Sequence, residues 1–177
     1  MTVIAATLVD GVLRMASESR IAYGGTTYRD DATKLFRLGD AIVGMTGTVH
    51  YDRSMMNAPH YKDGEDVVLY GYTLYDYWRA HDANMRMRKD KDTLGINAII
   101  GTRTCIVELN ADGSVIPVTR GWYAIGSGGP EARGALFATG GTNPIIGVRA
   151  AIALNSGCGG QIQTMMLGPV QDKDRAG

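Results

Sequence analysis

The threonine at position 2 combines two groups that could act together in catalysis. The chain begins Met1-Thr2-Val3-Ile4, so removal of Met1 would give Thr2 a hydroxyl and a free α-amine on one residue. A free α-amine has a pKa of about 7.7–8.0 and is partly neutral near pH 7. It can therefore serve as the base that a weak hydroxyl nucleophile requires. Small residues are also common at this position because they permit methionine cleavage, so Thr2 alone does not decide between the two interpretations.

A glycine-rich segment, Gly126-Ser127-Gly128-Gly129, is a second candidate for chemistry. It precedes a helix expected to begin near Pro130, and the N-terminus of a helix can hold a phosphate. However, the segment lacks the lysine of a P-loop and the full spacing of a dinucleotide-binding motif. A phosphate site is therefore not the favoured interpretation.

The cysteines and histidines do not form a metal-binding pattern. Cys105 and Cys158 lie far apart, there is no CxxC or HExxH motif, and His50, His60 and His81 have no ligand spacing with a cysteine. We therefore expect no metal and no cofactor. A chain of this size with two separated cysteines favours a reduced, cytoplasmic protein.

Composition excludes several classes of function. The 177 residues carry 18 basic and 18 acidic side chains, and this balance argues against a sequence-independent nucleic-acid surface. No apolar run approaches the roughly 20 residues that span a bilayer, and the first 15 residues do not resemble a secretory signal. The length favours one domain over residues 1–177, with a frayed tail at 168–177.

Short apolar runs separated by turn residues predict strands. Asp10-Gly11 and Gly39-Asp40 lie at the turns of two expected hairpins, and residues 17–33 are expected to form a polar loop. The expected strands are 3–9, 12–16, 34–38, 41–45, 96–100, 105–109, 115–118, 122–125 and 161–167.

Helices are expected between these blocks of strands. The apolar spacing predicts a long helix over 65–91, whose charged end at 86–92 is interpreted as solvated, and further helices are expected at 48–57, 131–138 and 144–154. The long helix has more aromatic residues than one core face needs, which favours an additional interface. Strands and helices in separate blocks indicate an α+β fold.

The order and spacing of these features resemble the β-subunits of the proteasome, including the bacterial HslV peptidase. Thr2 begins a strand, Glu18-Ser19-Arg20 follows sixteen residues later, and Lys34 stands 32 residues after Thr2. Gly44-Met45-Thr46-Gly47 ends one strand, and the 126–129 segment ends another. The resemblance extends from Thr2 to about Leu167.

This resemblance implies the N-terminal-nucleophile (Ntn) hydrolase fold, a four-layer αββα sandwich of two antiparallel sheets between helices. It also implies a threonine peptidase that forms a self-compartmentalising homo-oligomeric ring and cleaves peptides or unfolded proteins. An ATPase unfoldase is a further implied partner, whereas no nucleic-acid or membrane partner is expected.

Site residues follow from the same resemblance. Thr2 matches the nucleophile, Lys34 the lysine beside its hydroxyl, and Gly47 the glycine whose N–H helps to form an oxyanion hole. Glu18 stands where the family has the aspartate that pairs with the lysine, and a difference of one methylene changes the geometry.

Two further groups of residues complete the predicted site. Arg20, Met45 and Thr46 are expected to bind substrate, with the apolar Met45 favouring cleavage after hydrophobic residues. Ser127 matches the serine near the terminal amine. Asn155 and Cys158 align with an aspartate and a serine that support that amine, and both substitutions suggest altered activity.

The sequence leaves two other functions open. One is an Ntn amidohydrolase that acts on a small amide, and the other is a ring-forming scaffold with a degenerate site. The departures at Glu18, Asn155 and Cys158 add weight to the scaffold, but the threonine peptidase is the leading hypothesis.

Overall fold

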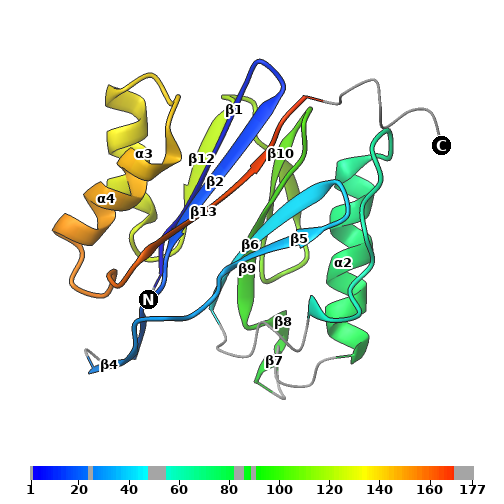
Figure 1. Ribbon diagram of the computed structural model, residues 1–177. Helices are drawn as coiled ribbons and strands as arrows, with labels where there is room; N and C mark the ends of the chain where they lie inside the picture. Colours follow the sequence, from blue (N-terminus) through cyan, green and yellow to red (C-terminus); the bar gives the residue numbers. More distant parts are fainter. Residues whose placement is uncertain (1, 24–25, 48–54, 82–85, 89–90, 170–177) are drawn as a thin grey trace.

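Two antiparallel sheets lie face to face between helices in the computed structural model, which describes residues 2–23, 26–47, 55–81, 86–88 and 91–169 (Figure 1). Helices α3 (Gly129–Ala138) and α4 (Pro144–Leu154) cover one sheet, and helix α2 (Val67–His81) covers the other. The expected four-layer α+β arrangement is confirmed.

The first sheet places the start of the chain in its centre. Its strand order is β12-β1-β2-β13, and every pairing is antiparallel. The expected Asp10-Gly11 turn joins β1 to β2. The strands are β1 (Ile4–Val9), β2 (Val12–Glu18), β12 (Trp122–Ile125) and β13 (Ile162–Leu167).

The second sheet has the strand order β11-β10-β9-β6-β5 and is also antiparallel. Its strands β5 and β6 form the second expected hairpin. The strands are β5 (Leu35–Leu38), β6 (Ala41–Gly47), β9 (Ile96–Gly101), β10 (Ile106–Leu109) and β11 (Val115–Pro117).

In the described part of the chain, three apolar clusters hold the four layers together. The cluster between the sheets includes Ile4, Met15 and Ile99, and a second cluster joins β1 and β2 to α3 and α4. The third packs the fully buried Leu74 and Trp78 of α2 against the second sheet.

Most aromatic residues of α2 contribute to core packing, because Tyr70 and Tyr75 belong to the same cluster as Trp78. Only Tyr72, 45% exposed, fits the expected interface surface well.

The structure corrects two expectations about secondary structure. The expected helix over 65–91 ends at His81, and strands β7 (Arg86–Arg88) and β8 (Lys91–Leu94) pair instead. The regular apolar spacing stops at Trp78, so the charged sequence beyond it has no apolar face to hold a helix against the sheet. The expected loop over 17–33 contains a second small hairpin, β3 (Ile21–Tyr23) with β4 (Thr26–Arg29).

The remaining strands and the helices α3 and α4 agree with the sequence predictions to within about two residues. Most of the helix expected over 48–57 and most of the tail lie outside the described residues. Among the described residues, no helix has the length and apolar character needed to cross a membrane.

Candidate active site around Thr2

Thr2 lies at the entry to β1, in contact with a lysine from the other sheet. The residue is 6% exposed, and its Oγ1 accepts a hydrogen bond of 3.0 Å from Lys34 Nζ. Lys34 immediately precedes β5 and is 1% exposed. The two sheets therefore jointly build the centre of the site.

Glu18, the last residue of β2, is the counter-charge of Lys34. Its side chain is fully buried, and its Oε1 forms an ion pair with Lys34 Nζ. The carboxylate also accepts three backbone hydrogen bonds, from Val3 N at 3.3 Å, Arg20 N at 2.7 Å and Gly159 N at 3.2 Å. The longer glutamate side chain is thus held at both oxygens.

Lys34 is fixed by more than its ion pair. Its Nζ also donates to Arg20 O at 2.6 Å, so three oxygens surround the amino group. Burial lowers the pKa of Lys34, and the charge of Glu18 opposes this change. The site therefore holds a desolvated lysine directly against a threonine hydroxyl.

The glycine-rich segment reaches the backbone of Thr2. The backbone nitrogen of Thr2 donates to Ser127 Oγ at 3.0 Å, and Gly128 N donates to Thr2 O at 3.1 Å. Gly126 has a φ of +93°, and a Cβ there would lie 2.2 Å from Thr2 O. Only glycine allows the chain to approach Thr2 this closely.

Asn155 and Cys158 lie behind this segment. Asn155 Nδ2 donates to Ser127 O at 3.0 Å, and Asn155 Oδ1 accepts from Gly157 N at 3.1 Å. Cys158 is 2% exposed, and burial together with the charge of Glu18 raises the pKa of its thiol. The thiol is therefore protonated near neutral pH.

The residues at the end of β6 have different environments. Gly47 has a φ of +112°, and a Cβ there would lie 2.0 Å from Gly95 O, so no side chain fits. Thr46 is 5% exposed, and its hydroxyl donates to Asn97 O at 3.4 Å. Met45 is fully buried in the core beneath α2. The oxyanion role of Gly47 and the substrate contacts of Met45 and Thr46 stay predictions.

Arg20 lies beside the site with its guanidinium engaged. Its Nε donates to Asp30 Oδ1 at 2.8 Å, and its Nη1 reaches Cys158 O at 3.5 Å. Its side chain is 26% exposed. A contact between Arg20 and substrate also stays a prediction.

Three residues near the site were not predicted from the sequence. Gln163 accepts from Lys34 N at 3.3 Å and donates to Ala32 O at 3.0 Å, which fixes the start of β5. Asp30 orients Arg20, and Glu131 accepts from Asn155 Nδ2 at 3.4 Å. None lies in a motif. The only local signal was the helix start at Pro130-Glu131, which suggests an acidic first turn and no more.

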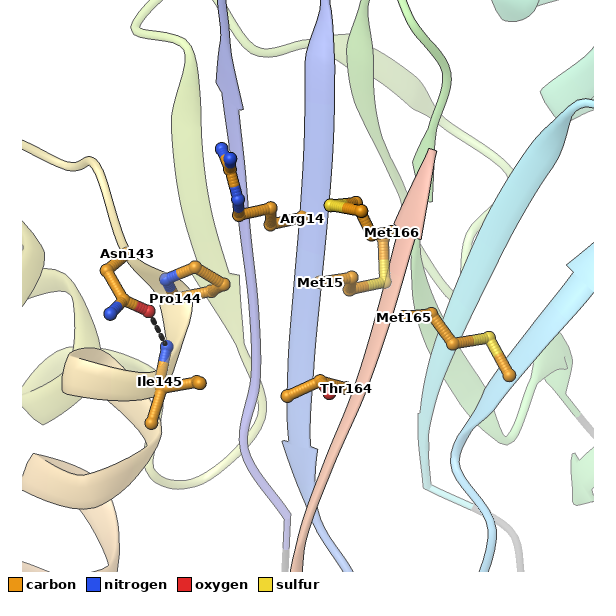
Figure 2. Close-up of a pocket in the computed structure, with 8 residues that line it drawn as sticks. All are labelled: Arg14, Met15, Asn143, Pro144, Ile145, Thr164, Met165 and Met166. Atoms are coloured by element: carbon orange, nitrogen blue, oxygen red, sulfur yellow. Dashed lines mark hydrogen bonds between the residues drawn. The ribbon is translucent and has the colours of Figure 1, made fainter. Parts of the chain in front are cut away.

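A cavity of about 260 Å³ lies away from these residues, between the first turn of α4 and strands β2 and β13 (Figure 2). Arg14 and Met166 line it, and Asn143 Oδ1 accepts from Ile145 N at 3.0 Å to cap α4 beside it. It contains none of the predicted site residues. Among the described residues, no group of three or more His, Cys, Asp or Glu could hold a metal ion.

Comparison with solved structures identifies the fold. The structure of BPH, a β-proteasome homologue of Thiobacillus denitrificans, matches with a TM-score of 0.79 and 21% identity, covering 97% of this chain and 100% of that chain. BPH in complex with epoxomicin matches with a TM-score of 0.78 and 20% identity over 94% of this chain and 98% of that chain. HslV from Trypanosoma brucei matches with a TM-score of 0.70 and 19% identity, over 93% and 98%.

These likenesses confirm the fold that the sequence resemblance predicted. The chain has the proteasome β-type, HslV-like fold of Ntn hydrolases over nearly its whole length. No protein-family model matches the sequence, and no curated protein matches it.

Proposed function

We propose that the chain is a threonine-type peptidase whose nucleophile is Thr2 after removal of Met1. The observation that carries this proposal is the 3.0 Å contact between Lys34 Nζ and Thr2 Oγ1, with Lys34 paired to the buried Glu18. A lysine desolvated in this way can stabilise a developing alkoxide on the threonine.

The proposed reaction uses the two groups of Thr2 in turn. The α-amine accepts the proton of the hydroxyl as Oγ1 attacks the peptide carbonyl, and the N–H of Gly47 donates to the resulting oxyanion. Collapse of the tetrahedral intermediate breaks the C–N bond, the protonated amine returns its proton to the leaving group, and an ester on Thr2 remains. Water then hydrolyses the ester and regenerates the hydroxyl.

Peptides or unfolded proteins are the proposed substrates, and a homo-oligomeric ring is the proposed assembly. An ATPase unfoldase is a proposed partner of that ring. These proposals rest on the fold shared with BPH and HslV. Epoxomicin, which one matched structure contains, is a suitable test compound and should inhibit this chain.

The test begins with the intact mass of the purified chain, which reports removal of Met1. Turnover of fluorogenic peptides is then compared between the parent, Thr2→Ala and Thr73→Ala. The control removes the same atoms from the exposed face of α2. We expect loss of hydrolysis in Thr2→Ala alone, with fold and assembly unchanged. A processed parent that cleaves neither peptides nor small amides would instead favour the scaffold function.

A further inference from the structure

The carboxylate of Glu131 contacts Asn155 near the Thr2 site, and one of its oxygens lacks a hydrogen-bond donor among the described residues. The residue lies in the first turn of α3, and its Oε2 is buried without a hydrogen-bond partner among the described residues. The helix dipole accounts for an acidic residue in this turn. It does not account for a buried oxygen that lacks a donor, because such an atom keeps its desolvation cost.

The other oxygen of Glu131 connects to Thr2 through two residues. Glu131 Oε1 accepts from Asn155 Nδ2 at 3.4 Å, and the same nitrogen donates to Ser127 O at 3.0 Å. Ser127 Oγ in turn accepts from the backbone nitrogen of Thr2 at 3.0 Å. Glu131 therefore helps to fix the amide of Asn155, which fixes the segment that holds the nitrogen of Thr2.

Among the described residues, no salt bridge joins Glu131 to a cation. Arg133, two residues further along α3, donates to Ala124 O at 2.9 Å and lies over the ring of Tyr123, and Arg149 of α4 is exposed. Lys34, beside β5, is paired with Glu18 of β2, and Arg20 is paired with Asp30. Cys158, from the connection between α4 and β13, is a neutral thiol. Removal of Met1 would add one new cation, the α-ammonium of Thr2, at the nitrogen that donates to Ser127 Oγ.

We infer that Glu131 is a positioning residue of the Thr2 site, which orders Asn155 and Ser127 and favours the protonated form of the Thr2 α-amine. The inference depends on the proposed function only in requiring that Thr2 becomes the first residue. Glu131 does not touch substrate. It sets the orientation and the proton affinity of the base that the proposed reaction uses.

The experiment measures the α-amine directly, without peptide hydrolysis. Each chain carries an N-terminal extension whose proteolytic removal leaves Thr2 first, so the amine exists in every sample. The rate of acetylation of that amine is followed from pH 5 to 9 by the mass of the N-terminal peptide. We expect the amine pKa to fall by at least about 0.5 in Glu131→Gln, because a nearby negative charge is lost.

Two variants separate this effect from general ones. Glu131→Asp keeps the charge and should keep most of the parental pKa. Asp76→Asn removes one charge from the exposed face of α2, which is separated from α3 by both sheets. This variant should leave the amine pKa unchanged. An amine pKa in folded Glu131→Gln equal to that of the parent, or an equal fall in Asp76→Asn, would overturn the inference. Either result leaves the peptidase proposal standing, because that proposal is judged by hydrolysis.

Thermal unfolding before and after removal of the extension gives an independent readout. In the parent, creation of the α-ammonium should raise the Tm because it compensates Glu131. In Glu131→Gln this gain should be smaller, and a purely structural role of Glu131 predicts the same gain in both proteins. An unchanged gain would therefore also count against the inference.

Discussion

Replacement of Glu18 by glutamine tests whether the buried ion pair supports both fold and site. The carboxylate accepts four hydrogen bonds, two at each oxygen. A glutamine amide has one oxygen, so its NH₂ group must face two donors in either orientation. Removal of one partner from a buried ion pair typically costs about 3–5 kcal/mol. We expect Glu18→Gln to lose stability in this range at pH 7, together with most peptide turnover.

The pH dependence of this loss has a defined sign. Burial lowers the pKa of Lys34 below its ordinary value of 10.5 in the folded chain, so the unfolded chain binds the proton more tightly. Stability therefore rises with pH between the pKa of Lys34 in the folded chain and its pKa in the unfolded chain. Without the charge of Glu18, the pKa of Lys34 in the folded chain falls further. The pH range over which stability rises therefore begins at a lower pH in the variant. The stability deficit of the variant should accordingly shrink as pH rises from 7 towards the parental pKa of Lys34.

Urea unfolding followed by the fluorescence of the fully buried Trp78 measures both effects, at equal protein concentration. A deficit below about 1 kcal/mol at pH 7 would refute the assignment of a tight buried pair. A deficit that grows with pH would refute the reasoning about Lys34. Peptide turnover across pH 6–9, measured on the same samples, should remain low in the variant.

Three further predictions concern Glu18, Gly126 and the two cysteines. Glu18→Asp should lower peptide turnover by about 10- to 100-fold, since a shorter side chain withdraws the carboxylate from Lys34. Higher turnover in this variant would instead indicate an enzyme with a degenerate site. Gly126→Ala should lower the unfolding free energy by at least about 2 kcal/mol in urea, because its φ is +93° and its Cβ would lie 2.2 Å from Thr2 O. A thiol reagent at pH 8 should modify Cys105 before the 2%-exposed Cys158, as peptide masses would show, and the reverse order would contradict the burial of Cys158.

The strands of the two large sheets were predictable because each is a local pattern. Apolar runs and turn pairs such as Asp10-Gly11 act over a few residues, and the structure keeps them. The hairpin of β3 and β4 was not predicted because the residues of β4, Thr26–Arg29, are all exposed and show no burial alternation. The hairpin of β7 and β8 was missed for a related reason, since a charged sequence does not specify its pairing partner.

The site was predictable only in part. Thr2 has its own chemical signal, whereas Lys34 taken alone resembles a surface lysine at the start of a strand. Its burial depends on packing between the two sheets, which only the family resemblance could suggest. Gln163 has no local signal, and Glu131 has only its place in the acidic first turn of an expected helix. They reach the site because β13 and α3 pack beside β1 and β2, and such long-range contacts leave no periodic trace in the sequence.

The division of the site between two sheets determines when the site can form during synthesis and folding. Thr2 and Glu18 arrive with the first sheet, and Lys34 arrives with the second. Each hairpin can form early from neighbouring residues, but the lysine meets the threonine only when the layers close over the shared core. A nascent or half-folded chain therefore lacks an assembled centre. Under the proposed function, this delay would protect other proteins during synthesis, because cutting could begin only once folding is complete.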